Sequence, residues 1–304
     1  MATRAALVLL VVAALPASGT SKTPQHILDR LRKLPLWPTG PWALHNAAKK
    51  GDAEAIDRLL DEAPAETPVI DAFDLDAMTP LILAVKEGHT DAVAALLRRG
   101  ADPDKTDRPG NAPLHWGAKE GQAEAIQTLI DGGATVDYSG PLGSNTALIF
   151  AVLNQHLDSV RTLLSAGADP NVKVRRGRTA LSAATAKNRG DLVSMLVEAG
   201  ADVNMLSGIP GKMRTPLMIA AELGAAYAAD SLLRGGSHLN IRNSMGDTAL
   251  DVARQFMAAP PPGGSYELHA EIIQMLNALE EEYTRAKQRK QKKQKKTTTT
   301  EKEL

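Results

Sequence analysis

The chain has 304 residues, with 35 Lys and Arg against 35 Asp and Glu, and it contains no cysteine. The absence of cysteine excludes disulfide scaffolds, zinc-thiolate sites, cysteine nucleophiles and redox dithiols. Apolar residues make up 43% of the sequence but aromatic residues only 3%, so small and medium-sized side chains must fill any core. This composition favours a repeat architecture, in which each unit contacts only its neighbours, over one large globular core.

The N-terminal segment is typical of a secretory signal peptide. Arg4 precedes an apolar run over residues 5–15, and the small residues 17–19 follow Pro16. As a helix this run would span about 16 Å, and it is shorter than the roughly 20 residues that a bilayer core requires. We expect residues 1–19 to be cleaved, which would place the protein in the secretory pathway, secreted or in the ER lumen. An uncleaved anchor and an organelle transit peptide are the alternatives.

Residues 20–40 predict a capping helix followed by a linker. Thr23 is suited to the N-cap and Pro24 to the first helical position. Pro35 and Pro38 end the helix, and its apolar face comprises Ile27, Leu28, Leu31 and Leu34. Such a helix would cover the open end of a repeat array.

From residue 41 onwards the sequence repeats itself every 33 to 37 residues. Equivalent segments begin at Leu44, Leu81, Leu114, Leu148, Leu181, Leu217 and Leu250. In the first six, an apolar pair begins 15 residues after this leucine, as Leu59 and Leu60 illustrate. Constant spacing within a unit, with variable spacing between units, predicts two packed helices joined to the next pair by a loop.

The motifs inside each unit have a physical explanation. Thr79 can cap a first helix whose first turn accommodates Pro80. Glycine suits the tight link to the second helix, where positive φ is needed. It occupies this position at residues 51, 88, 121 and 224. The fifth unit has Asn188 there, and the fourth unit is the exception, with Gln155. Small residues at one position allow close helix packing: Ala47, Ala84, Gly117, Ala151, Ala184, Ala220 and Ala253. Segments such as 107–110 and 244–247 have the turn chemistry of projecting hairpins.

These segments resemble ankyrin repeats over residues 41–283. The motifs that carry the resemblance are Thr79-Pro80-Leu81, Ala112-Pro113-Leu114-His115, Thr146-Ala147-Leu148, Thr179-Ala180-Leu181, Thr215-Pro216-Leu217 and Thr248-Ala249-Leu250. The resemblance implies an all-α solenoid of six or seven helix-turn-helix units with projecting β-hairpin fingers. The seventh unit departs from the pattern because residues 258–265, which include three consecutive prolines, separate its helices.

No catalytic or metal-binding motif accompanies the repeats. The sequence lacks a His-Glu-x-x-His zinc pattern, a phosphate-binding Gly-Lys-Ser/Thr loop and a Gly-x-Ser-x-Gly elbow. His45 and His115 occupy the family's structural histidine position, where the resemblance implies a local hydrogen bond. We therefore expect a non-enzymatic protein without metal or cofactor.

The resemblance implies that partners contact the finger tips and the exposed ends of the first helices. The corresponding finger residues are Leu75, Asp76 and Met78; Arg108 and Asn111; Leu142 and Asn145; Arg175, Arg176 and Arg178; and Ser244 and Met245. The corresponding first-helix residues are Lys86, Glu87, Lys119, Glu120, Leu153, Asn154, Lys187, Glu222 and Leu223.

Two fingers stand out by composition. Lys173, Arg175, Arg176 and Arg178 form a cluster suited to carboxylates or phosphates, although an exposed finger can be basic merely for solubility. The longer finger, residues 205–214, offers Met205, Leu206, Ile209 and Met213 as apolar anchors, unless they fold back onto the neighbouring finger.

The charge is unevenly distributed. Residues 20–283 carry 25 basic and 33 acidic residues, whereas residues 284–296 carry eight basic and no acidic ones. The low-complexity tail, residues 284–304, could bind nucleic acid, a nuclear import receptor, anionic lipid or another polyanion. A cleaved leader would favour lipid or polyanion, and the alternative is a solvated extension of the last helix.

The sequence therefore predicts a monomeric scaffold in the secretory pathway that binds another protein through its concave face and finger tips. The alternative function is that of a polyanion or membrane-surface binder acting through the basic tail.

Overall fold

The computed structural model describes residues 42–63, 69–140, 143–258 and 266–300. The predicted signal peptide and capping helix, residues 1–40, lie outside the described residues, as does Leu142. The chain divides into two compact units, residues 1–140 and 141–304.

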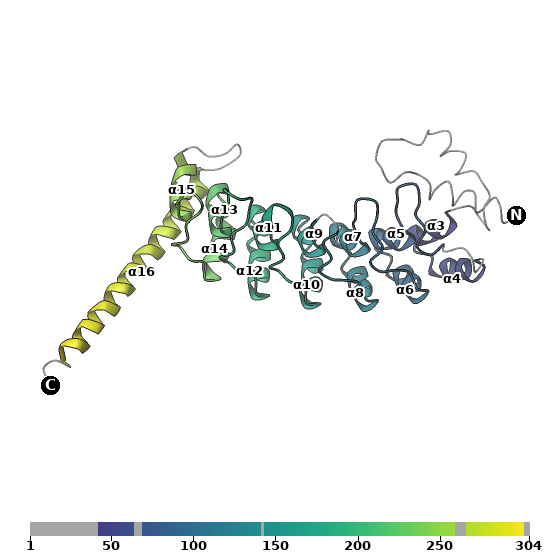
Figure 1. Cartoon of the computed structure of the whole chain (residues 1–304), viewed down its shortest axis with the longest axis horizontal. Helices are drawn as coiled ribbons and strands as arrows, with labels where there is room; N and C mark the ends of the chain where they lie inside the picture. The colour runs from purple at the N-terminus through teal and green to yellow at the C-terminus, as the bar shows by residue number, and fades with distance from the viewer. Residues whose placement is uncertain (1–41, 64–68, 141–142, 259–265, 301–304) are drawn as a thin grey trace. The chain divides into compact units, whose positions relative to one another are not determined.

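The first unit is a stack of helix pairs (Figure 1). The pairs are α3 (Ala43–Lys50) with α4 (Ala53–Asp61), α5 (Pro80–Glu87) with α6 (Thr90–Arg98), and α7 (Pro113–Glu120) with α8 (Ala123–Asp131). The first helices pack on one another in the order α3, α5, α7, and the second helices in the order α4, α6, α8. The unit therefore has two helical layers, with loops that project from the first-helix side (Figure 1).

The second unit follows the same plan. Its pairs are α9 (Ala147–Leu153) with α10 (Leu157–Ser165), α11 (Ala180–Ala186) with α12 (Gly190–Glu198), α13 (Pro216–Leu223) with α14 (Ala226–Arg234), and α15 (Ala249–Ala258) with α16 (Tyr266–Thr300). The helix α16 packs on both α14 and α15, so the last pair occupies the place of a further repeat despite the proline-rich segment inside it. Its backbone continues through the basic tail to Thr300 (Figure 1).

The predicted helix starts are confirmed. The hydroxyls of four threonines accept the backbone N–H three residues later: Thr79, Thr146, Thr179 and Thr215. The fifth, Thr248, is part of a reciprocal cap, because the Asp251 carboxylate accepts from both the N–H and the hydroxyl of Thr248. These hydrogen bonds lower the pKa of Asp251. Each cap satisfies an N–H group that would otherwise lack a partner within the helix.

The small residues allow the helices to pack closely, as predicted. Ala84, Ala151, Ala184, Ala220 and Ala253 have no exposed surface. At the equivalent Gly117, an added Cβ would lie 3.0 Å from Ile126 Cγ1 and 3.1 Å from Val85 Cγ1. A larger side chain at this position would therefore separate the helices.

The links between first and second helices have positive φ, as predicted. The φ angles are 74° at Gly51, 78° at Gly88, 81° at Gly121 and 66° at Gly224. Gln155 also has positive φ, at 63°, although glutamine at this position does not predict it. Asn188 has φ 52°. Tertiary packing thus imposes one backbone conformation on three residue types.

Side chains at the links also join neighbouring repeats. Nε2 of His89 donates to the Lys49 carbonyl (3.1 Å), and Nε2 of Gln122 donates to the Lys86 carbonyl (3.4 Å). In the second unit, Nε2 of the buried His269 donates to the Glu222 carbonyl (3.2 Å). These bonds satisfy carbonyl groups at the ends of first helices, and they fix each pair on its predecessor.

Candidate protein-binding surface

Three of the fingers are short turns closed by their own first residue. Oδ1 of Asp74 accepts from the N–H of Met78 (2.8 Å), and Oδ1 of Asp107 from the N–H of Asn111 (2.7 Å). Oδ1 of Asn243 accepts from the N–H of Asp247 (2.9 Å) in the same way. The predicted turns are therefore confirmed, although the described residues show only two isolated β-bridges, Val174 with Arg178 and Ser207 with Arg214. An Asp or Asn at the start thus takes the place of a β-ladder.

In the first unit the predicted contact residues divide by exposure. Asp76 and Arg108 are exposed at their finger tips, whereas Leu75 and Met78 are half-buried. Asn111 is half-buried and its Nδ2 donates to Oδ2 of Asp107 (3.1 Å), so this side chain helps to build the finger. Asp76 and Arg108 remain accessible to a partner.

Trp116, in the same unit, was missed by the sequence reasoning. It lies on α7, one residue after the structural histidine, and its Nε1 donates to Oδ2 of Asp107 (3.0 Å). The Nζ atoms of Lys86 and Lys119 lie 5.0 and 4.3 Å from the centroid of its ring. The two lysines therefore gather around a fixed indole through cation–π contact. The sequence feature that could have indicated Trp116 is a large aromatic residue at a first-helix position whose residue type differs between the repeats.

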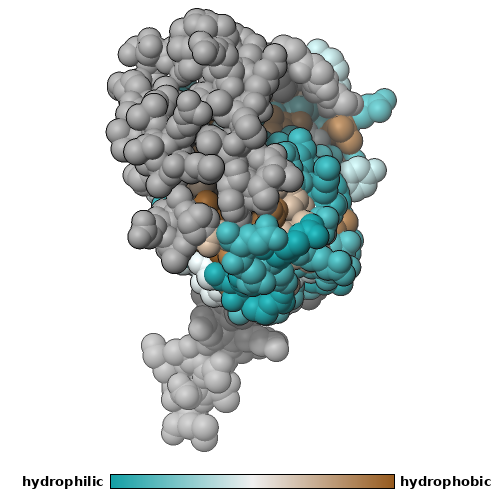
Figure 2. All heavy atoms as spheres, turned by 90° about the vertical axis from the view of Figure 1, so that its right-hand side faces the viewer, coloured by the Kyte–Doolittle hydropathy of each residue, from teal (hydrophilic) through white to brown (hydrophobic). Residues whose placement is uncertain are grey.

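The described surface of the first unit, seen from the α3 and α4 side, is largely hydrophilic with small separate hydrophobic spots (Figure 2). Phe73 lies on this unit and is 36% exposed, with Nζ of Lys105 lying 5.7 Å from its ring centroid. Scattered apolar residues of this kind are normal on a soluble surface.

The second unit contains the basic finger, residues 173–178. Its Lys173, Arg175, Arg176 and Arg178 are all exposed. Among the described residues, none of these four side chains makes an ion pair. Arg176 has φ 64°, in the left-handed region that costs a residue with a Cβ about 1 kcal/mol or more. The finger therefore holds a strained backbone that displays unpaired guanidinium groups.

The long finger, residues 205–214, is only partly as predicted. Ile209 is exposed (46%), but Met205, Leu206 and Met213 are half-buried. Backbone bonds between Ser207 and Arg214 close it (2.8 and 2.9 Å), and the Arg214 guanidinium pairs with Glu222 of α13. The finger is therefore tied to its own helix, with one strongly exposed apolar side chain.

The last finger, residues 243–247, carries Met245, which is 75% exposed. Ser244 is exposed as well, and its hydroxyl donates to the Gly211 carbonyl of the long finger (2.7 Å). Asn145, by contrast, is half-buried just before α9.

The fingers of the second unit are joined side by side, which sequence reasoning could not show. The Arg175 N–H donates to the Gly143 carbonyl (3.0 Å). A Cβ on Gly177 would lie 2.6 Å from the carbonyl oxygen of Gly208, so the basic and long fingers touch through their backbones. With the Ser244 bond, these contacts form the finger row, which comprises residues 173–178, 205–214 and 243–247.

The first-helix ends differ between the units. Glu87, Lys119 and Glu120 are exposed in the first unit and Lys86 is half-buried. In the second unit Asn154, Lys187 and Leu223 are exposed, while Leu153 and Glu222 are half-buried. The same structural position is therefore charged in one unit and partly apolar in the other.

The structural histidines are held as the motif implies, but with longer-range partners. Nδ1 of His115 accepts from the Ala112 N–H (2.9 Å), and its Nε2 donates to the Tyr138 carbonyl (2.8 Å). Nε2 of His45 donates to the Ala72 carbonyl, 27 residues away (2.9 Å). Burial lowers the pKa of both histidines, although these carbonyls and nearby Asp74 and Asp107 oppose the shift. A purely local bond was therefore too narrow an expectation.

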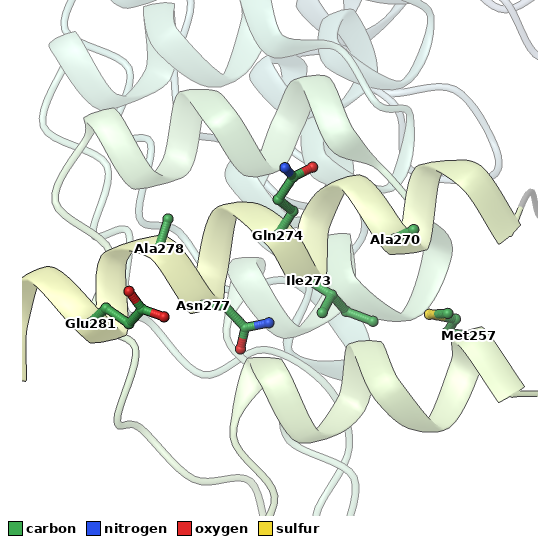
Figure 3. Close-up of a pocket in the computed structure, with 7 residues that line it drawn as sticks. All are labelled: Met257, Ala270, Ile273, Gln274, Asn277, Ala278 and Glu281. Atoms are coloured by element: carbon green, nitrogen blue, oxygen red, sulfur yellow. The ribbon is translucent and has the colours of Figure 1, made fainter.

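A shallow groove of about 430 Å³ lies between α15 and α16. Ile273 and Asn277 point from α16 towards α15, near Met257, and Glu281 is the one ionisable residue in its lining (Figure 3). Glu281 pairs with Arg285 one turn later (3.0 Å). Such a lining offers neither a nucleophile nor an acid–base pair.

Other site types find little support in the described residues. No group of three or more His, Asp or Glu is placed to hold a metal ion in this part of the chain. Within the same ranges, every helix is too short or too polar to span a lipid bilayer.

The stacked helix pairs with joined fingers define a repeat protein of the ankyrin class. A family model for ankyrin repeats matches residues 13–107, 44–139 and 114–207, which is more than half of the chain. The chain therefore belongs to the ankyrin-repeat family. Proteins of this family typically mediate protein–protein interactions, and the fold is generally a non-catalytic interaction scaffold.

Curated relatives share the repeats but are longer. Human ankyrin repeat and SOCS box protein 16 is 33% identical over 253 residues, covering 78% of this chain and 47% of that protein. The mouse B-cell lymphoma 3 protein homolog is 31% identical over 183 residues, covering 60% of this chain and 32% of that protein. This chain thus spans about half or less of the length of these relatives.

Solved ankyrin repeat domains have the same fold. The domain of human ASB11 matches with a TM-score of 0.61 and 26% identity, covering 77% of this chain and 96% of that domain. The domain of Bcl-3, a member of the IkappaB protein family, matches with a TM-score of 0.66 and 26% identity, covering 76% and 97%.

Proposed function

We propose that this chain is a non-enzymatic scaffold that binds another protein through its finger tips and the exposed ends of its first helices. The observation that carries the proposal is the finger row of the second unit. Its side chains include exposed Arg175, Ile209 and Met245 on fingers that contact one another. A surface held in place before binding loses little conformational entropy when a partner docks.

The proposed compartment is the secretory pathway, and the proposed state is a monomer. The basis for the compartment is Arg4 with the apolar run over residues 5–15, which is typical of a signal peptide. The mass of the mature N-terminus tests this: a chain that begins at Thr20 is expected, and one that retains residues 1–19 contradicts it.

A second candidate function is binding of a polyanion or an anionic membrane surface through the tail. The observation in its favour is the eight basic residues between 284 and 296, which lie on the continuous helix α16. Charges of one sign on such an extension attract polyanions, with an affinity that falls steeply with salt.

Site-specific photo-crosslinking tests the scaffold function. A benzophenone amino acid is placed at Ile209 or Met245 in the finger row, and at Tyr227 on α14 as a control of similar exposure. Tyr227 is 73% exposed, so accessibility alone would label it more than Ile209 and about as much as Met245. Cross-links to one partner protein from Ile209 and Met245, but not from Tyr227, are expected. Equal labelling from all positions, or none from the fingers, contradicts the proposal.

A further inference from the structure

The finger row has a composition that defines the chemistry of its partner, an inference that rests on the proposed scaffold function. Five exposed cationic side chains gather on its basic and long fingers: Lys173, Arg175, Arg176, Arg178 and Lys212. The row itself contains one acidic residue, the half-buried Asp247, whose Oδ2 accepts from Nδ2 of Asn243 (3.3 Å), and Glu222 of the neighbouring α13 is paired with Arg214. The surface therefore carries a concentrated positive charge on a chain whose residues 20–283 are acidic overall.

The apolar side chains of the row lie beside this charge. Ile209 is 46% exposed at the tip of the long finger, and Met245 is 75% exposed at the tip of the last finger. The close approach of Gly177 to Gly208 sets Ile209 next to the basic finger, and the bond from Ser244 to Gly211 brings Met245 to the other side. A ligand that covers the row meets guanidinium groups at one end and apolar side chains at the other.

Backbone hydrogen bonds hold the basic finger of the row in one conformation. Arg175 is anchored through its own N–H to Gly143, and the Val174 N–H donates to the Arg178 carbonyl (3.0 Å). Arg176 is kept at positive φ between them, a conformation that surrounding contacts must maintain. The backbone positions of the three arginines are therefore set before any ligand arrives.

We propose that the finger row binds an acidic peptide segment in which carboxylates are followed by apolar residues. Planar guanidinium groups gathered on one finger match carboxylates with paired hydrogen bonds, and Ile209 with Met245 takes the apolar side chains. Nucleic acid fits less well because the row has no aromatic side chain on which bases could stack. A membrane surface fits less well because stable lipid binding needs a broader apolar face than two side chains provide.

The test uses the full chain and fluorescence polarisation of labelled peptides. The probe is a peptide with the sequence Glu-Asp-Glu-Glu-Leu-Glu-Leu-Leu, and a second peptide replaces every Leu with Ser. The variant combines Arg175→Gln, Arg176→Asn and Arg178→Gln, because Asn tolerates the positive φ of position 176. The matched control removes three exposed guanidinium groups elsewhere in the unit, by Arg161→Gln, Arg234→Gln and Arg254→Gln.

The finger variant should bind the first peptide at least about tenfold more weakly than the natural chain, and the control variant within about twofold. Ile209→Ser and the Leu-free peptide should each weaken binding about threefold, because both remove the apolar contact. Circular dichroism melting of each variant shows whether it is folded, and the Leu-free peptide tests the natural chain without any mutation.

Several results would overturn this inference: no binding of the first peptide, equal loss in the control variant, or no effect of the Leu residues. The same holds if phosphatidylserine vesicles or single-stranded RNA bind as tightly, with the same dependence on the three arginines. In each case cross-links from Ile209 to a protein would still stand, so failure of the ligand assignment is distinct from failure of the scaffold function.

Discussion

Gln155 and Asn188 adopt one backbone conformation for different energetic reasons. Both have positive φ at links where other repeats use glycine. Oδ1 of Asn188 accepts from the Ala228 N–H (3.1 Å), so its side chain completes the start of α14. Oε1 of Gln155 accepts from the guanidinium of Arg189 (2.8 Å) at the exposed surface, where such a bond contributes little. Gln155 therefore carries backbone strain with weak compensation.

Glycine at these two links should have opposite effects. We expect Gln155→Gly to raise the free energy of unfolding by about 0.5 kcal/mol, because relief of left-handed strain exceeds the added entropy of the unfolded chain. Asn188→Gly should lower it by about 1 kcal/mol, because the Ala228 N–H loses its acceptor. Urea unfolding of both variants checks the pair. Destabilisation by both would show that the side-chain bond of Gln155 outweighs its backbone strain.

At the scale of elements, α16 combines a packed part and a charged part. Among the residues of α16 whose burial the structure describes, the buried ones are His269, Ile272 and Leu276, all within its first three turns. This part rests on α14 and α15 and covers the last repeat, as the capping helix of a solenoid does. The basic residues 285–296 come later in the same helix. The first part of α16 thus contributes to stability through packing, and the later part of the same helix carries the basic charge.

Deletion after Tyr283 should separate these two parts. The melting temperature should stay within about 2 °C of the natural chain, because the buried residues of α16 remain. The contrasting variant, Ile272→Ala, should lower the free energy of unfolding by about 2–4 kcal/mol, because it leaves a cavity in the core. Under the scaffold function, cross-links from Ile209 persist after the deletion. If the deletion abolishes partner capture and high salt does the same to the natural chain, the tail carries the function instead.

For the molecule as a whole, loss of stability between pH 7.5 and pH 5.5 should be concentrated in the first unit. Burial lowers the pKa of both His45 and His115 below the ordinary value of 6.5, and both lie in this unit. Because the unfolded chain then binds protons more readily than the folded one, stability is complete above the unfolded pKa. It is lost as the pH falls from about 6.5 towards the lowered folded values.

Hydrogen exchange at pH 7.5 and pH 5.5 measures this effect, after correction for the intrinsic pH dependence of exchange. Protection of residues 42–140 should decrease at the lower pH, and His115→Gln should reduce the decrease while lowering stability at pH 7.5 by about 1–2 kcal/mol. Unchanged protection in this unit at pH 5.5 would contradict the neutral, buried state of the two histidines.

Much of the repeat structure could be read from local chemistry. Thr79 and Pro80 predict the start of a helix, Gly88 predicts its end, and residues 107–110 predict a turn. Each of these structures depends on only a few neighbouring residues. The positive φ of Gln155 escaped this reasoning, since packing between helices imposed it against the preference of the residue. Trp116 escaped it as well, because its importance depends on Lys86 in another repeat.

The sequence by itself determined the repeat, its caps and the small residues that let helices approach, because periodic burial and backbone hydrogen bonding are local requirements repeated along the chain. Only the tertiary structure decided which exposed residues act together. Arg175, Ile209 and Met245 are about 35 residues apart from one to the next, and their fingers become one surface through contacts such as Gly177 with Gly208 and Ser244 with Gly211. The spacing of residues in the sequence does not predict such contacts, because they form only when neighbouring repeats stack.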